Sequence, residues 1–507
     1  MCGISASKPS DSVFMSYAVR AQEKRGPDET HVLDLGFASV GINRLSISGL
    51  VKGSQPLSSK DGTTIVVFNG AIYNVDQICS DFGFVLESSN DGEVIASLYQ
   101  RFGLSFANYL EGMFAICIID NLNQLMVVAV DPIGIKPLYL YSGLDEVICV
   151  ASDISSFPES IRNKAVRVPP GTVWCSDGRR QRVARAYCSQ GGLLELLRES
   201  VYQQIPKEVG WGCMLSGGLD SSLIVQLASE RVSNLTTLTC GMRDGTDMVA
   251  GRTMATHVGS SHHEILVDTE ELPLLVDEVI RATCSMEPWT IMGGVGTYLV
   301  ARDAKRLGLK VLLSGEGADE LFGGYDEFQN IPDIFLDSIL MQYQADLGVS
   351  ECLRLDRCSM AHSIESRVPF LCTSVIRRSR MILPSEKIKK TDLLSICKYA
   401  LRQAAAEVLP REFSDRSKEE FSHGSGISSQ LNLIARRMYS NEKVAQIAQK
   451  HPSFCISTPS EAWFLDRWLF IFGESIGLDW KELARRGLVR QPVSFYIPRI
   501  SDPAIYL

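Results

Sequence analysis

The sequence predicts two folds joined in one chain: an α+β part built from layered sheets, followed by an α/β part with a parallel sheet. Up to about residue 190, short apolar segments recur with turn residues between them, which is typical of layered strands. Beyond that point apolar strands alternate with helical segments, which is typical of a parallel sheet. Because 507 residues exceed what one core usually supports, we expect two domains, residues 2–190 and 191–507.

The elements expected in the first domain are short. Apolar strands are predicted at 63–69, 113–119, 124–130 and 147–152. A helix is predicted at 91–102. Residues 156–187 are polar and contain prolines, which indicates a domain boundary near residue 190.

The second domain begins with a helical pattern, after which predicted strands and helices alternate. Its predicted elements are a helix at 191–204, a strand at 211–215, a helix at 219–229, a strand at 235–240, a helix at 295–307 and a strand at 310–313. After residue 330 helical patterns dominate, and we find no motif beyond about residue 478.

The composition excludes several classes of protein. Hydrophobic residues make up 45% and charged residues 21%, as in globular proteins rather than disordered ones. A net charge of -9 argues against a protein that neutralises nucleic-acid phosphates. No apolar run is long enough to cross a bilayer, and the first residues carry no secretory signal. The 14 cysteines are scattered without a Cys-x-x-Cys pair. We therefore expect a cytoplasmic protein with reduced thiols and with no nucleic-acid or membrane partner.

Residues 216–221, Ser-Gly-Gly-Leu-Asp-Ser, form a loop between a predicted strand and a predicted helix. The glycines let the backbone approach a ligand closely, and the amides at the helix N-terminus favour an anion. The loop lacks the lysine of a Walker loop, so we interpret it as a cradle for pyrophosphate. Asp220 could hold Mg²⁺ on the phosphates. The plainer alternative is a glycine-rich turn capped by serine.

A second cluster follows the strand at 310–313 and contains Glu316, Asp319 and Glu320 between glycines. Ligands of open α/β sheets bind at such strand ends. Repulsion among three carboxylates is unfavourable unless a cation compensates it. We therefore expect a bound cation here, and a solvated acidic loop is the alternative.

Cys2 becomes the first residue if Met1 is removed. An N-terminal cysteine combines nucleophile and base, because its free α-amine can accept the thiol proton. A separate Cys-His dyad is then unnecessary, and His31 is the one histidine in the first third of the chain.

Four segments of the first domain resemble class II glutamine amidotransferases, also called N-terminal nucleophile glutaminases: 25–28 (Arg-Gly-Pro-Asp), 44–47 (Arg-Leu-Ser-Ile), 69–74 (Asn-Gly-Ala-Ile-Tyr-Asn) and 91–94 (Asp-Gly-Glu-Val). Residues 216–221, 314–325, 361–371 and 416–421 resemble the synthetase half of glutamine-dependent asparagine synthetases. The Ser-Gly-Gly-Leu-Asp-Ser segment at 216–221 of this chain is similar to the PP-loop of ATP pyrophosphatases. The resemblance extends to about residue 475 and implies an N-terminal nucleophile domain followed by a PP-loop domain.

The resemblance assigns roles by motif. Catalysis is implied for Cys2, Asn69, Gly70, Glu316 and Lys418. Glutamine binding is implied for Arg44 at the α-carboxylate, Asp91 at the α-ammonium, and Asn69 with Gly70 as the oxyanion hole. ATP and pyrophosphate binding is implied for Leu215, Ser216, Gly217, Gly218, Asp220, Ser221, Cys240, Ser314 and Gly315. Asp220 and Asp319 would hold Mg²⁺.

The same resemblance implies the reaction. Cys2 releases ammonia from L-glutamine, and the synthetase half uses Mg-ATP to convert a small carboxylic acid to an acyl-adenylate. Ammonia reaches the adenylate through an internal tunnel and displaces AMP, which leaves an amide. The implied cofactors are ATP and Mg²⁺, and the family suggests a homodimer.

The acceptor segment departs from the family pattern. Asparagine synthetases of this family hold aspartate with a Thr-Thr-Ile-Arg type segment, whereas this chain reads Trp289-Thr290-Ile291-Met292. Losing a charge-assisted contact costs roughly 1.5–3 kcal/mol. Trp289 and Met292 predict an apolar acceptor pocket. Cys372 and His423 also replace aspartates of the family pattern.

Three hypotheses follow for function. The first is amidation of a carboxylic acid other than aspartate, as in specialised metabolism. The second is asparagine synthesis, with Met292 misaligned or with Arg302 reaching the pocket. The third is a non-catalytic regulator that binds nucleotide or glutamine, and the intact Cys2, Asn69 and Asp220 argue against it.

Overall fold

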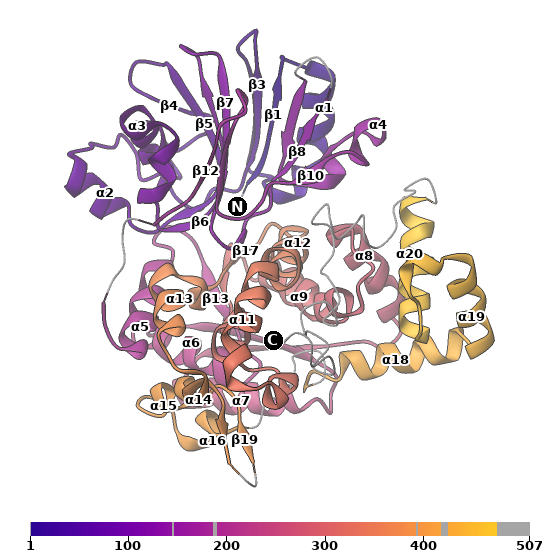
Figure 1. Ribbon diagram of the computed structural model, residues 1–507. Helices are drawn as coiled ribbons and strands as arrows, with labels where there is room; N and C mark the ends of the chain where they lie inside the picture. The colour runs from indigo at the N-terminus through magenta and orange to yellow at the C-terminus, as the bar shows by residue number, and fades with distance from the viewer. Residues whose placement is uncertain (1, 144–146, 186–189, 392–393, 417–423, 474–507) are drawn as a thin grey trace, which may run out of the picture.

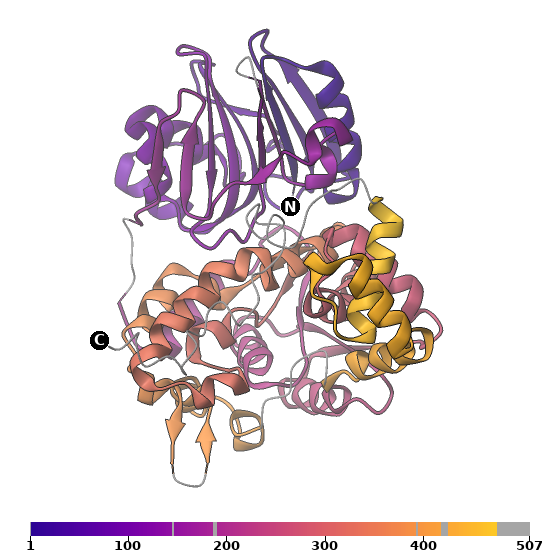
Figure 2. The same ribbon diagram turned by 45° about the vertical axis from the view of Figure 1, so that its right-hand side comes forward.

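The computed structural model of the protein describes residues 2–143, 147–185, 190–391, 394–416 and 424–473. Two parts are stacked on each other in Figures 1 and 2: an N-terminal part, residues 2–185, and a C-terminal part, residues 190–473. The sheets of the first are antiparallel and the large sheet of the second is parallel, which confirms the predicted fold classes. The predicted division at residue 190 adjoins residues 186–189, which lie outside the described residues, and it stays a prediction.

The N-terminal part contains two six-stranded sheets that pack face to face. One has the order β10-β8-β9-β1-β3-β2, with bounds Val166–Arg167, Tyr139–Ser142, Ile148–Ala151, Gly3–Lys8, Ser39–Arg44 and Glu29–Asp34. The other has the order β12-β11-β7-β6-β5-β4, with bounds Arg180–Arg182, Thr172–Cys175, Leu125–Val130, Gly112–Asp120, Thr64–Ile72 and Leu57–Ser58.

Helices cover the outer faces of both sheets, so central strands such as β5, β6 and β7 are buried on both sides (Figure 1). The helices are α1 (Ser12–Ala21), α2 (Val75–Phe82), α3 (Glu93–Phe102) and α4 (Glu159–Arg162). In β5, Ile65 and Val67 face the other sheet, whereas Val66 and Phe68 face the layer of α2 and α3. Burial on both faces explains why the strand is a continuous apolar run rather than an alternating one.

The polar segment 156–187, in which no strand or helix was predicted, contains α4, β10, β11 and β12 among its described residues. These elements are short, and β10 and β12 lie at sheet edges, so their sequences carry few apolar residues. In β11, Val173 and Cys175 are buried and alternate with partly exposed residues, which is the pattern of a strand covered on one side. The short strands β1 to β3 and helix α1 were also not predicted.

The C-terminal part is built on a five-stranded parallel sheet with the order β15-β14-β13-β16-β17. The strands are Ser261–Leu266, Thr236–Gly241, Trp211–Met214, Val311–Leu313 and Glu365–Arg367. β13 lies between β14 and β16, so the loops that follow β13 and β16 emerge side by side at the carboxyl edge. These loops are the Ser216–Ser221 segment and the acidic segment, which the fold therefore brings together.

Helices cover both faces of this sheet and form the end of the described chain. They are α5 (Leu193–Gln204), α6 (Leu219–Ser229), α7 (Thr246–Val258), α8 (Leu272–Thr283), α9 (Pro288–Arg306), α10 (Ala318–Phe322), α11 (Asp333–Asp346), α12 (Glu351–Met360), α13 (Thr373–Arg380), α14 (Pro384–Lys387), α15 (Tyr399–Ala405), α16 (Arg411–Ser414), α18 (Ile427–Met438), α19 (Asn441–Lys450) and α20 (Pro459–Phe472). A two-stranded ribbon, β18 (Lys389–Lys390) and β19 (Ser395–Ile396), projects from it.

Helix α9 begins seven residues before the predicted start at residue 295. Gly293 and Gly294 concealed its first turns, because glycine is unfavourable inside a helix. Here they permit close packing. A Cβ on Gly294 would lie 2.7 Å from Val279 Cγ1 of α8, and a Cβ on Gly293 would lie 2.8 Å from Arg354 Nη1 of α12.

A buried ion pair joins the two parts. Arg25 Nη1 and Nη2 lie 2.9 and 3.2 Å from the carboxylate oxygens of Asp356 on α12, and both side chains are buried. Arg25 Nε also donates to the carbonyl of Cys2 over 3.2 Å. Bidentate pairing of this kind fixes orientation as well as distance, so α12 is held firmly beside the start of β1.

Acidification is expected to destabilise the fold through His362, next to β17. Burial, together with Lys305 and Arg302, lowers the pKa of His362 to about 4 from 6.5. Between these values the unfolded chain binds more protons than the folded one, so the free energy of unfolding falls as pH falls. Between pH 7 and pH 5 this group accounts for at most about 2 kcal/mol. Urea denaturation should show that the free energy of unfolding falls less between pH 7 and pH 5 in His362→Gln than in wild type.

His257 on α7 is exposed and supplies the matched control. His257→Gln should retain the wild-type loss of stability between pH 7 and pH 5. An identical loss in His362→Gln and wild type would contradict the prediction.

Within the ranges that the structure describes, no helix is both long and apolar enough to cross a membrane.

Candidate active sites

Cys2 directly precedes β1, and its carbonyl oxygen accepts from Arg25, which forms the ion pair that joins the two parts. Its side chain is buried, and its N–H donates to Asn69 Oδ1 over 3.0 Å. Asn69 Nδ2 is also buried and has no hydrogen-bond partner among the described residues. A buried donor without a partner is unfavourable in the resting protein. It is suited to an oxyanion that forms beside Cys2, as the sequence predicts.

Gly70 follows Asn69 on β5, where the strand presses against β6. A Cβ at this position would lie 2.0 Å from the Met113 carbonyl oxygen, so no larger residue fits without moving the strand. Close packing of β5 against β6 therefore explains why glycine occupies the predicted oxyanion position. It places Asn69 and Gly70 together near Cys2, and their catalytic role remains a prediction.

Gln55 is a residue of this site that the sequence analysis missed. Its Nε2 lies 3.9 Å from Cys2 Sγ and donates to the Phe68 carbonyl over 3.2 Å, while its Oε1 accepts from Phe68 N–H at 2.8 Å. These contacts fix the amide beside the thiol. A polar residue followed by Pro56 ahead of a strand was the available signal, but such a dipeptide is typical of any turn.

Arg44 and Asp91 are brought together through Ser48. Arg44 Nη2 donates to the carbonyls of Ser48 and Gly49 at 3.0 and 2.9 Å. The Ser48 hydroxyl donates to Asp91 Oδ1 over 2.6 Å. Glu29 Oε1 lies 2.5 Å from Arg44 Nη1, so the guanidinium is partly neutralised. A cation at the end of β3 and an anion ahead of α3, both in contact with Ser48, can receive the carboxylate and ammonium of an amino acid.

Titration of the first site is set mainly by burial. Burial raises the pKa of the Cys2 thiol, and the nearby Arg44 charge opposes the rise. Burial also raises the pKa of Asp91, against hydrogen bonds from Ser48 and Ile72. A thiol with a raised pKa needs a base to become a nucleophile. The α-amine of an N-terminal Cys2 would supply that base without a histidine.

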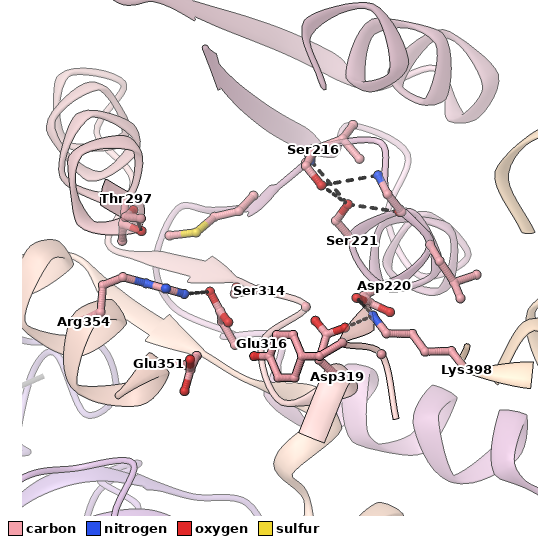
Figure 3. Close-up of a pocket in the computed structure, with 18 of the residues that line it drawn as sticks. Ser216, Asp220, Ser221, Thr297, Ser314, Glu316, Asp319, Glu351, Arg354 and Lys398 are labelled. Atoms are coloured by element: carbon pink, nitrogen blue, oxygen red, sulfur yellow. Dashed lines mark hydrogen bonds and ion pairs between the residues drawn. The ribbon is translucent and has the colours of Figure 1, made fainter. Parts of the chain in front are cut away.

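A second site is a cavity of about 260 Å³ at the carboxyl edge of the parallel sheet. Its lining includes most of the residues predicted for ATP and pyrophosphate: Leu215, Ser216, Gly218, Asp220, Ser221, Cys240, Ser314 and Gly315. Gly217 lies in the same loop with φ +71, and a Cβ there would meet Ala250 C at 2.3 Å. The structure thus groups the predicted nucleotide residues around one cavity (Figure 3).

The Ser216–Ser221 loop is closed by its own hydroxyls. Ser216 and Ser221 Oγ atoms lie 3.1 Å apart, Ser221 Oγ donates to Gly218 O over 3.2 Å, and Gly218 N–H donates to Ser216 Oγ over 3.3 Å (Figure 3). Helix α6 begins directly afterwards at Leu219. Its first amides and dipole face the loop, which is the geometry of an anion cradle.

The two predicted metal ligands meet around a lysine. Lys398 Nζ lies 2.5 Å from Asp220 Oδ2 and 2.7 Å from Asp319 Oδ1 (Figure 3). Burial disfavours the charged form of Lys398, but the two carboxylates outweigh it and raise its pKa. Two carboxylates with open space toward a phosphate cradle suit Mg²⁺, which usually takes one or two carboxylates plus phosphates and waters. Asp220 and Asp319 therefore fit the predicted metal.

Glu316 pairs with Arg354 on the other side of the cavity. Arg354 Nη2 lies 2.6 Å from Glu316 Oε1, and both residues line the cavity (Figure 3). Burial raises the pKa of Glu316, while Arg354 lowers it. A carboxyl that lines a cavity, and whose pKa is raised by burial and lowered by a neighbouring cation, is suited to exchange a proton. Arg354 was not predicted, because nothing in its surroundings distinguishes it from a helix-surface arginine.

One face of α9 borders the cavity through Trp289, Gly293, Thr297 and Val300, which follow helical spacing. Met292, which we expected in the acceptor pocket, is not on this face. It is buried in the apolar core with Val279 and Leu299. The helix turns by about 100° per residue, so Gly293 rather than Met292 faces the cavity.

Other departures from the family pattern also lie away from the cavity lining. Arg302, the alternative cation, has its Nη1 3.6 Å from Glu271 Oε2 and does not line the cavity. Cys372 is buried and its Sγ contacts Glu111 Oε1 at 3.6 Å, where the two parts meet. Lys418 and His423 lie outside the described residues.

The fold and the two sites define a class of protein: a cysteine glutaminase of the N-terminal nucleophile type joined to a PP-loop synthetase. Family models agree, since the Glutamine amidotransferase domain matches residues 1–168 and Asparagine synthase matches residues 192–340 and 335–454. The chain belongs to the glutamine-hydrolysing asparagine synthetase family, as the sequence motifs predicted. It is a glutamine-dependent, ATP-using ligase.

Curated plant relatives support the same family. The chain is 30% identical to asparagine synthetase [glutamine-hydrolyzing] 2 of Oryza sativa subsp. japonica, over 90% of this chain and 82% of the relative. It is 31% identical to asparagine synthetase [glutamine-hydrolyzing] 3 of Arabidopsis thaliana, over 90% of this chain and 84% of the relative. A glutamine phosphoribosylpyrophosphate amidotransferase from B. subtilis is a weak structural match, with TM-score 0.32, 17% identity and 52% and 81% coverage of this chain and that chain.

Proposed function

We propose that the two sites act in sequence, with Cys2 supplying ammonia to the cavity of the C-terminal part. The Cys2 thiolate attacks the glutamine amide carbon, and Asn69 Nδ2 with the Gly70 N–H stabilises the tetrahedral oxyanion. Collapse of this intermediate expels ammonia and leaves a thioester, which water hydrolyses to glutamate. Support comes from the unpartnered Asn69 Nδ2 beside Cys2.

In the second step a carboxylate attacks the α-phosphate of ATP and pyrophosphate leaves into the Ser216–Ser221 loop. Asp220 and Asp319 would hold Mg²⁺, which would neutralise phosphate charge. Ammonia then attacks the acyl carbon, AMP leaves, and the nitrogen loses a proton. Glu316 is positioned at the cavity wall to accept that proton. Lys418 keeps its predicted role at the phosphates.

The acceptor is proposed to be a carboxylic acid that is less charged than aspartate. The observation that carries this proposal is the uncharged wall formed by Trp289, Gly293, Thr297 and Val300 on α9. Trp289 remains 58% exposed while lining the cavity, which leaves a large apolar surface for a ligand. Met292 lies in the core and not in the cavity lining, which weakens the sequence argument for an apolar pocket. The exposed apolar surface of Trp289 still supports it.

Asparagine synthesis is the second candidate, and Arg354 favours it. Arg354 packs over Gly293, where a Cβ would lie 2.8 Å from its Nη1, and its Nε is buried with no hydrogen-bond partner among the described residues. A guanidinium that is not fully committed to Glu316 could receive the α-carboxylate of aspartate. The positive charge that binds aspartate would then be Arg354 on α12, instead of an arginine on α9.

Product analysis separates these candidates. Purified full-length protein would be incubated with glutamine, Mg-ATP and either aspartate or a panel of apolar carboxylic acids, and AMP and amide measured by mass spectrometry. A larger kcat/KM for an apolar acid supports the first candidate. A clear preference for aspartate would replace it with asparagine synthesis. The cytoplasmic location and the homodimer remain predictions of the sequence.

Truncation of Trp289 tests the acceptor wall directly. Trp289→Ala removes apolar contact area worth roughly 1.5–3 kcal/mol, so kcat/KM for an apolar acceptor should fall about 10- to 100-fold. The KM for ATP and the rate of glutamate release should not change. Leu307→Ala, at the exposed far end of α9, is the control and should behave as wild type. A proportional loss for ATP would contradict an acceptor-specific role.

A further inference from the structure

Lys398 occupies the gap between the two carboxylates that are proposed to hold Mg²⁺. Its Nζ contacts Asp220 Oδ2 at 2.5 Å and Asp319 Oδ1 at 2.7 Å. The lysine comes from the start of α15, whereas the aspartates lie in the first turns of α6 and α10. Figure 3 shows the three side chains converging on one point at the cavity wall.

The surrounding backbone is built to hold this arrangement. Lys398 is 4% exposed and has φ +54, a left-handed conformation that is strained for a residue other than glycine. Gly324 packs against the pair without a side chain. A Cβ there would lie 1.8 Å from Asp319 Oδ1 and 2.2 Å from Lys398 Cε. Strain and close packing together indicate that the lysine position is specified and not incidental.

The ammonium and a metal ion cannot use this gap at the same time. Mg²⁺ lies about 2.0–2.1 Å from its carboxylate ligands, so it would take the space and the lone pairs that Lys398 Nζ uses. The two cations would also repel each other strongly at such a distance. Metal entry therefore requires Lys398 to leave, and its departure requires another anion to receive the charge.

ATP supplies that anion. Its phosphates would enter the Ser216–Ser221 loop, within the same cavity as Lys398. The flexible four-carbon stem of lysine allows its ammonium to move from carboxylate to phosphate. The free metal brings no anion to receive the lysine ammonium, so it must compete with Lys398 for the two carboxylates and binds more weakly.

We propose that Lys398 is a resident counter-cation that makes metal binding at Asp220 and Asp319 conditional on nucleotide. In the resting protein it keeps the two carboxylates neutralised and together. When ATP binds, Lys398 transfers its contacts to the phosphates and the metal takes its place between the aspartates. This inference rests on the proposed Mg²⁺ site and adds the order of binding.

Titration with Mn²⁺, followed by electron paramagnetic resonance, tests the inference without turnover. Full-length wild type should bind Mn²⁺ at least tenfold more weakly alone than with α,β-methylene-ATP. Lys398→Met should bind Mn²⁺ alone at least tenfold more tightly than wild type, and Lys398→Gln should behave in the same way. Lys398→Arg should resemble wild type. Lys398→Met combined with Asp319→Asn should lose the gained affinity.

Lys387→Met is the matched control, because Lys387 is also buried and lies 2.7 Å from Asp337 Oδ1, outside the cavity lining. It should leave Mn²⁺ binding unchanged. Equal Mn²⁺ affinity of wild type and both neutral Lys398 variants without nucleotide would overturn the proposal. Absence of Mn²⁺ binding in every variant with α,β-methylene-ATP would overturn the metal site itself, and the conditional binding with it.

Discussion

Cys2→Ala is expected to abolish glutamine-dependent amide formation while leaving ammonia-dependent formation intact. Loss of a covalent nucleophile typically reduces the rate by on the order of 10³-fold or more. The C-terminal cavity contains no part of the Cys2 side chain, so added ammonium chloride should still support AMP release. Glutamate release and AMP release, measured in parallel with each nitrogen source, check the two halves of this expectation.

Cys149→Ala provides the matched control in the same part of the chain. Cys149 is a buried thiol on β9, and burial raises its pKa to about 12, so it cannot act as a nucleophile at neutral pH. Its removal should leave both activities near wild type. Glutamate release that persists in Cys2→Ala would assign the glutaminase to another residue.

The layered fold of the N-terminal part could be predicted where strands are long and buried on both faces. β5, β6 and β7 form continuous apolar runs, so the sequence locates them within a few residues. The short strands β11 and β12 carry too few apolar residues to differ from a polar segment. β11 is stabilised by pairing with β7, and the edge strand β12 by pairing with β11, which are tertiary contacts that the local sequence does not report.

Some residues of the two sites could likewise be predicted from the sequence, and others could not. Residues on loops with a distinctive spacing, such as Ser216–Ser221, can be picked out from sequence because the motif and the strand end coincide, and in the structure they line one cavity. Lys398 and Arg354 could not be found, since each reaches its site from a helix distant in sequence. Met292 was assigned to the pocket because it stands where the family's Thr-Thr-Ile-Arg type segment has arginine. That comparison locates it along the chain but not on a particular face of α9, and the helix places it in the core.

Gly324→Ala is expected to have the second large effect, on the ATP-dependent half alone. The added Cβ would lie 1.8 Å from Asp319 Oδ1 and 2.2 Å from Lys398 Cε, so at least one of these groups must move. A displacement of about 1 Å at a catalytic constellation costs on the order of 10²-fold in rate. Amide formation with either glutamine or ammonia should fall by about that factor. Glutamate release at Cys2 should remain near wild type, because the substitution lies in the other part.

Gly308→Ala separates misplacement at the site from the general effect of replacing a glycine. Gly308 has φ +74, but a Cβ at this position would have no neighbouring atom within 4 Å, so the substitution adds backbone strain of about 1–2 kcal/mol without a collision. It should lower the melting temperature slightly and leave amide formation unchanged. If Gly308→Ala and Gly324→Ala lose amide formation equally, the effect reflects destabilisation of the C-terminal part. If only Gly324→Ala loses it, the close packing of Asp319 and Lys398 is itself required for the ATP-dependent step.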